Sequence, residues 1–169
     1  MTGISETKIA ASPSWRARLA EILPYLGHRN WIAVVDSAYP LQSGDGVEMQ
    51  CAGEDMIETL EQVVSAIGDS PHVAASIFVD AELDELAEAD APGVTAYRER
   101  LGAVLGSQCV LSRPHEEIID MIDGAAAKFH VLIIKTQFTL PYTSVFFRLE
   151  CGYWDEDRER RLRSTFETR

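Results

Sequence analysis

FHVLIIKTQFTLPYTSVFFRLE, residues 129–150, is the stretch that decides the fold. Val131–Ile134 is a continuous apolar run of the kind that forms a strand buried on both faces. Val145–Phe147 is a second apolar run, and the segment between the two is rich in hydroxyl groups and turns at Pro141 and Tyr142. Polar groups at the ends of buried strands often bind small ligands in α/β proteins. The stretch therefore predicts either a ligand site or an ordinary loop between two strands.

The composition limits the class of protein. The length of 169 residues and the hydrophobic content of 46% indicate one globular domain, and the net charge is −12. The segment between Arg29 and Arg98 contains no Lys or Arg. A chain this acidic is poorly suited to binding phosphate backbones, so we expect no nucleic-acid partner. No apolar run approaches the roughly 18 residues of a membrane span, so we expect no membrane association.

The compartment is indicated by the N-terminus and the cysteines. The first residues lack the basic start and apolar middle of a signal peptide. Cys51, Cys109 and Cys151 are scattered and show no CxxC spacing. This pattern is typical of reduced thiols and predicts a cytoplasmic protein.

Strands and helices alternate along the chain. Apolar runs predict strands at 31–35, 47–51, 73–79, 108–111, 131–134 and 145–147. Helical spacing and helix-end residues predict helices at 14–26, 55–67, 94–105 and 112–127. The alternation predicts an α/β fold, with a largely parallel sheet flanked by helices. We expect a flexible N-terminal arm at 1–13, a single domain at 14–154 and a charged C-terminal extension at 155–169.

The common catalytic motifs are missing. The four histidines, His28, His72, His115 and His130, form no HxH or HxxxH pair, so no metal site is expected. The glycine-rich phosphate loops and the GxSxG motif are also missing, which disfavours nucleotide cofactors and hydrolase chemistry. We expect no cofactor. Considered alone, His28 and Asp36 fit a structural role at the two ends of a strand better than a catalytic one.

Three separated motifs resemble one family. Gly27-His28 leads into WIAVVDSAYP at 31–40, with Asp36 eight positions after His28. HEEI begins at His115, and KTQFTLPYTS occupies 135–144. In this order the motifs resemble the RbsD/FucU family, which comprises ribose pyranases and fucose mutarotases. The resemblance spans roughly Trp15 to Gly152 and implies the single-domain RbsD-like fold.

The resemblance also implies roles for individual residues. It assigns His28 and Asp36 as catalytic, with His28 as proton donor and Asp36 as a ligand of sugar hydroxyls that can also serve as base. Substrate binding is assigned to Asp36, His115, Tyr142, Thr143 and Ser144. The chain departs from the family pattern at Arg29, Asn30, Gln137, Phe138 and Ser144.

The chemistry of such a family suits these residue types. Opening a cyclic sugar requires removal of the anomeric hydroxyl proton and delivery of a proton to the ring oxygen, and reclosure gives another anomer or ring size. Histidine, with a reference pKa of about 6.5, can perform such transfers without metal or cofactor. We therefore expect an isomerase acting on a fucose- or ribose-like monosaccharide, with fucose mutarotase activity favoured over ribose pyranase activity. A non-catalytic sugar-binding or regulatory protein and a purely structural ring subunit remain the alternatives.

The spacing of His28 and Asp36 bears on assembly. Eight extended residues at about 3.3 Å each place them roughly 26 Å apart, much farther than the width of one sugar. Either the segment at His28 folds back sharply, or a neighbouring copy supplies one of the two residues. The family resemblance implies the second arrangement, a ring-shaped homo-oligomer such as a decamer, with its sites at subunit interfaces.

Overall fold

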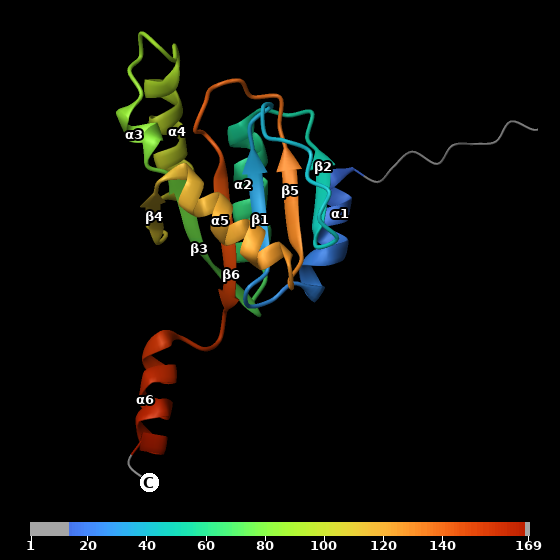
Figure 1. Cartoon of the computed structure of the whole chain (residues 1–169), viewed down its shortest axis with the longest axis vertical. Helices are drawn as coiled ribbons and strands as arrows, with labels where there is room; N and C mark the ends of the chain where they lie inside the picture. Colours follow the sequence, from blue (N-terminus) through green and yellow to red (C-terminus); the bar gives the residue numbers. More distant parts are fainter. Residues whose placement is uncertain (1–13, 168–169) are drawn as a thin grey trace, which may run out of the picture.

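The computed structural model describes residues 14–167, so the arm expected at 1–13 lies outside the described residues. Strands and helices alternate through most of this part of the chain (Figure 1). The strands are β1 (Trp31–Val35), β2 (Val47–Cys51), β3 (Val73–Asp80), β4 (Val110–Arg113), β5 (Val131–Lys135) and β6 (Val145–Cys151). The helices are α1 (Trp15–Ile22), the 3₁₀ turn η1 (Leu23–Tyr25), α2 (Met56–Gly68), α3 (Glu82–Glu85), α4 (Val94–Leu105), α5 (His115–Ala126) and α6 (Glu156–Glu167).

The six strands form one sheet in the order β2-β5-β1-β6-β3-β4. Strand β6 runs antiparallel to its two neighbours, β1 and β3. The other five strands point in one direction, because β2 and β5 are parallel to β1, and β4 is parallel to β3. The expected α/β fold with a largely parallel sheet is confirmed. The two apolar runs of residues 129–150 are not neighbours in the sheet, because β1 lies between β5 and β6.

Helices cover both faces of the sheet, with α5 in front of it and α2 behind it in Figure 1. The alternation of side chains along each strand sends Ile32 and Val34 to the face of α1, α2 and α4, and Ala33 and Val35 to the face of α5. Every residue of β1 is buried. The apolar runs are therefore explained by burial of the central strands on both faces.

The ends of several elements differ from the expected ones. Strand β4 begins two residues later than predicted and includes Ser112 and Arg113, because their backbone pairs with Val79 and Asp80 of β3. Helix α5 therefore begins at His115 rather than at Ser112. At the other end of the chain, helix α1 stops at Ile22, and Pro24, which has no N–H to continue the helix, lies in the 3₁₀ turn.

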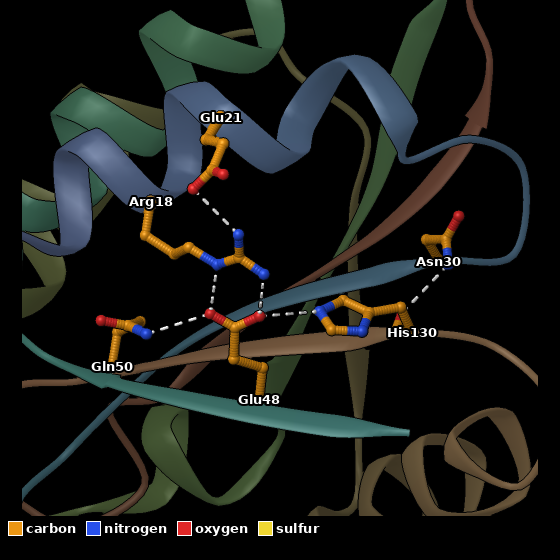
Figure 2. A network of polar contacts seen from close by, with 6 residues as sticks. All are labelled: Arg18, Glu21, Asn30, Glu48, Gln50 and His130. Carbon is orange, nitrogen blue, oxygen red and sulfur yellow. Dashed lines mark hydrogen bonds and ion pairs between the residues drawn. The ribbon is translucent and has the colours of Figure 1, made fainter. Parts of the chain in front are cut away.

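A cluster of charged and polar side chains fastens the edge strand β2 (Figure 2). Arg18 of α1 donates two hydrogen bonds to the Glu48 carboxylate, at 2.6 and 2.7 Å. The Nε2 atom of His130 lies 3.5 Å from the same carboxylate, and the Asn30 amide donates to the His130 carbonyl. The hydrogen bonds from Arg18 lower the pKa of Glu48. This cluster joins α1 and β2 to the segments that precede β1 and β5.

The C-terminal extension contains a helix that the sequence patterns did not predict. Helix α6 occupies most of the segment 155–169 and lies beyond the end of β6, away from the sheet (Figure 1). Trp154, Leu162 and Phe166 are exposed, and ion pairs such as Arg163 with Glu159 link successive turns of the helix. Local charge pairs of this kind stabilise a helix only modestly.

Two glycines give a matched test of the packing. A Cβ atom at Gly46 would lie 2.0 Å from the Ala126 carbonyl oxygen, whereas one at Gly124 in α5 would meet no atom within 4 Å. We expect Gly46→Ala to lower the free energy of unfolding by about 1–3 kcal/mol, because backbone must shift. Gly124→Ala should raise it by up to about 1 kcal/mol, because alanine favours a helix interior. Urea denaturation measures both, and equal effects would contradict the close packing at Gly46.

Candidate functional site

The candidate site lies at the end of the sheet where the parallel strands finish, beyond their C-terminal residues. There, β1 leads to Asp36, β3 ends at Asp80, and the antiparallel strand β6 begins at Val145. A cavity of about 460 Å³ at this end is lined by Asp36, Ser37, Ala38, Tyr39, Pro40, Gln42, His115, Glu116, Ile119, Thr139, Leu140, Pro141 and Tyr142. Its size lies within the range of about 300–1,000 Å³ that is common for small-molecule sites.

A larger hollow of about 830 Å³ lies elsewhere, between the segment 41–47 and the last turn of α5 with the residues that follow it. It is more open to solvent and contains none of the predicted site residues. The smaller cavity is the better candidate, because it brings three predicted site residues together: Asp36, His115 and Tyr142.

Asp36 is held firmly at the end of β1. Its Oδ1 atom accepts hydrogen bonds from the backbone N–H groups of Ala38 and Tyr39, at 2.8 and 3.1 Å. Its own N–H donates to the Ser144 hydroxyl, at 3.4 Å. Within the described residues, no hydrogen bond reaches the second carboxylate oxygen, Oδ2. That oxygen is free to accept a hydrogen bond from a ligand hydroxyl.

His115 is the first residue of α5 and is anchored from behind. Its backbone N–H donates to the Glu82 carboxylate, and its ring Nδ1 lies 3.0 Å from Oδ1 of Asp80. Asp80 is 1% exposed, and burial is the main cause that raises the pKa of its carboxyl, while the His115 side chain acts in the opposite direction. The site therefore contains a histidine whose Nδ1 atom faces the buried carboxyl group of Asp80.

Tyr142 has an unusual backbone conformation next to this histidine. Its φ is +56°, in the left-handed region that non-glycine residues rarely occupy. The Thr143 hydroxyl donates to the Leu140 carbonyl at 2.7 Å, and the buried Tyr97 hydroxyl donates to the Thr143 carbonyl at 2.6 Å. These bonds hold the turn so that the Tyr142 ring stands edge-on to the His115 ring, with 5.7 Å between the ring centroids. The exposed part of Tyr142, 37% of its surface, is open to a ligand.

Thr143 and Ser144 follow the cavity residue Tyr142 in the chain but do not themselves line the cavity. Both residues are buried, and neither lines the cavity. Their hydroxyl groups already bond within the chain, to the Leu140 carbonyl and the Asp36 N–H. Direct contact between these two residues and a ligand stays a prediction; what the structure shows is that they shape the turn.

His28 lies at the opposite end of the sheet, where the parallel strands begin. Its Nδ1 atom is 2.8 Å from Oε2 of Glu150, near the end of β6, where β6 pairs with the beginning of β1. The His28 side chain is 57% exposed, in a turn in which Arg29 has a φ of +77°. The turn does not bring His28 back to Asp36, so the fold-back alternative is wrong for a single chain.

Two residues of this site were missed by sequence reasoning. Asp80 ends a buried strand just as Asp36 does, and that shared pattern was the available signal. Tyr97 lies on α4, far along the chain from the turn that it supports, and no local pattern predicts its hydrogen bond to Thr143. Lys135, the last residue of β5, donates from Nζ to the Tyr39 carbonyl and so holds the wall of the cavity.

Neither a metal cluster nor a membrane span is found in the part of the chain that the structure describes. No group of three or more His, Cys, Asp or Glu residues between 14 and 167 is arranged to hold a metal ion. No helix among the same residues has the length and apolar character needed to cross a bilayer.

Comparison with known proteins gives a family match. The model of the RbsD / FucU transport protein family matches residues 11–152. No functionally curated protein sequence matches the chain. Helix α6 lies outside the matched residues.

Three solved structures have the same fold. Bacillus subtilis RbsD, complexed with D-ribose, is 17% identical with a TM-score of 0.58, over 87% of this chain and 100% of its own. The fucose mutarotase of Streptococcus pneumoniae, in complex with L-fucose, is 19% identical with a TM-score of 0.54, over 87% and 98%. FucU from Bifidobacterium longum is 15% identical with a TM-score of 0.52, over 79% and 93%. At these identities the likeness shows the fold alone.

The hydrogen bond between Tyr97 and Thr143 can be tested by one substitution. Tyr97→Phe removes the hydroxyl that satisfies a buried carbonyl, so we expect the free energy of unfolding to fall by about 1–3 kcal/mol. Tyr25→Phe is the matched control, because the Tyr25 side chain is exposed, and it should change stability by less than about 0.5 kcal/mol. Urea denaturation gives both values. A Tyr97→Phe protein as stable as the control would show that this bond does not support the turn.

Proposed function

We propose that this chain, which belongs to the RbsD/FucU family, interconverts the anomers or ring forms of a monosaccharide. The observation that carries the proposal is the cavity that brings Asp36, His115 and Tyr142 together at one end of the sheet. A carboxylate oxygen, an imidazole and a phenol ring are groups that bind sugar hydroxyls and move protons. The reaction requires only proton transfer, which these side chains can perform without a cofactor.

The proposed substrate class follows from the family and its solved members. Two of the three structural neighbours were solved with a sugar, D-ribose or L-fucose, so a fucose- or ribose-like sugar is the first choice for this chain. Asp36 accepts hydrogen bonds from sugar hydroxyls through Oδ2, and the exposed part of the Tyr142 ring packs against the apolar face of the sugar. This makes the protein an isomerase, with fucose mutarotase activity tested before ribose pyranase activity.

The proton donor in this proposal is His28 of a second copy of the chain. In one chain, the length of the five-residue strand β1 separates His28, which precedes it, from the cavity at its other end. His28 is exposed, and its Nδ1 lies against Glu150, so Nε2 is the ring nitrogen that can reach a sugar bound to a second copy. A ring-shaped homo-oligomer, such as a decamer, would place that histidine at a neighbour's cavity.

A non-catalytic sugar-binding protein is the second candidate. It is favoured by the departures from the family pattern at Asn30, Gln137 and Ser144. Asn30 and Ser144 both use their side chains to fasten the backbone, the first at Gly27 and the second at Asp36. Sugar binding without anomer exchange would identify this second function.

Anomer exchange should be visible by saturation-transfer NMR with a panel of pentoses, hexoses and deoxyhexoses. We expect the wild-type protein to accelerate exchange of at least one fucose- or ribose-like sugar. His28→Ala should reduce that rate by about 10²–10⁴-fold, the usual contribution of a general acid or base, while circular dichroism shows an intact fold. His72→Ala is the matched control, because His72 contacts the Leu23 carbonyl far from the cavity. An unchanged rate in His28→Ala would remove His28 from the mechanism.

The shared site can be tested by mixing two inactive proteins. His28→Ala and Asp36→Ala subunits each lack one half of the site, so their mixture should regain part of the activity under conditions that allow subunit exchange. Some interfaces in the mixture then combine an intact His28 with an intact Asp36. Light scattering measures the size of the assembly. A monomer, or no recovery despite demonstrated subunit mixing, would contradict the shared site.

A further inference from the structure

A buried carboxyl group stands behind the site histidine, and the proposed function does not yet use it. Asp80 is 1% exposed, and its Oδ1 atom lies 3.0 Å from Nδ1 of His115. Its second oxygen, Oδ2, is buried and has no hydrogen-bond partner within the described residues. An unpaired buried carboxylate oxygen is costly, so its presence beside a cavity points to a functional reason.

The geometry sets the protonation of the imidazole. A neutral histidine carries one N–H, and a carboxylate beside Nδ1 places that hydrogen on Nδ1. The other nitrogen, Nε2, then keeps its lone pair and makes no hydrogen bond within the described residues. Because His115 lines the cavity while Nδ1 faces the buried Asp80, Nε2 belongs to the part of the ring that a ligand can reach.

The charges around this pair suit it to accept a proton. Asp36 and Glu82, which belong to the neighbouring segments, carry negative charges that raise the pKa of Asp80. The His115 ring lowers the pKa of Asp80. Asp36 itself is already engaged through Oδ1 by two backbone N–H groups. A proton taken up by His115 would therefore sit between carboxylates, which stabilise an imidazolium.

We infer that His115 accepts the proton of the anomeric hydroxyl through Nε2, and that Asp80 is the positioning residue that prepares it. This inference rests on the proposed function. As the hydroxyl proton moves to Nε2, the anomeric oxygen forms a carbonyl bond and the bond from the anomeric carbon to the ring oxygen breaks. The electron pair of that bond goes to the ring oxygen, which takes a proton from the donor. Reclosure on the other face of the carbonyl reverses each transfer. Asp36 then has a binding role.

The first measurement needs no sugar and no substitution. The ¹⁵N chemical shifts of the His115 ring report which nitrogen carries the hydrogen, and we expect the Nδ1–H tautomer in the wild-type protein at neutral pH. Asp80→Asn should populate the other tautomer. A dominant Nε2–H form in the wild type would overturn the inference, because Asp80 would then carry the proton and His115 could not accept one through Nε2.

The second measurement is anomer exchange in Asp80→Asn, an isosteric change. We expect the rate at saturating sugar to fall by about 10²-fold while the dissociation constant of the sugar stays nearly the same. The acid limb of the rate–pH profile should move to lower pH, because the imidazolium loses the carboxylate that stabilises it. Asp84→Asn is the matched control, since Asp84 lies four residues after Asp80, on α3, and is exposed.

The outcomes separate this inference from the proposed function. A wild-type rate and an unmoved acid limb in Asp80→Asn would overturn the role of Asp80. Asp80→Glu, which keeps the charge, should recover part of the lost rate, and a rate no better than that of Asp80→Asn would also count against it. If the wild-type protein exchanges no sugar, the proposed function and the proton transfer fail together, while the tautomer measurement still decides whether Asp80 orients His115.

Discussion

Five of the six strands run in the same direction and so finish at the same end of the sheet, and this common direction is fixed by the hydrogen bonds that pair them. The carboxyl ends of β1 and β3 therefore deliver Asp36 and Asp80 to one place, and the antiparallel β6 begins beside them. The same constraint keeps His28, which precedes β1, at the far end. A site whose residues all lie at one end of the strands can form within a single chain, whereas a site that needs residues from both ends requires two copies of the chain.

The regular parts of this fold were predictable because their signals are local. Strand β2 and helix α4 have the bounds expected from the sequence, since turn residues and helix-ending glycines flank them. Strand β4 was misplaced because Ser112 and Arg113 are polar, and only backbone pairing with β3 makes them part of a strand. The three cysteines are free, Cys51 and Cys151 lie in strands, and none of the three is buried.

The site was predictable in part, for the same reason. Asp36, His115 and Tyr142 could be found because they lie in motifs that resemble a family. Asp80 could not be assigned a role, because its importance depends on a histidine 35 positions away that only the folded sheet brings to it. The cavity also concentrates two local costs, the left-handed backbone of Tyr142 and the unpaired Oδ2 of Asp80. Costs of this kind persist where the surrounding fold compensates for them, as the Tyr97 hydrogen bond does here.

The position of β6 in the sheet has a consequence for how the protein is made. Strands β2, β5 and β1 form one group and β3 and β4 another, and β6 pairs with both groups. Because β6 occupies residues 145–151, the two groups cannot be joined until the chain through residue 151 has left the ribosome. Until then β1 and β3 each expose an unpaired, apolar edge, which is open to pairing with other nascent chains. Strand β6 is thus the strand that closes the domain, and until it emerges the two groups of strands stay open to misassembly.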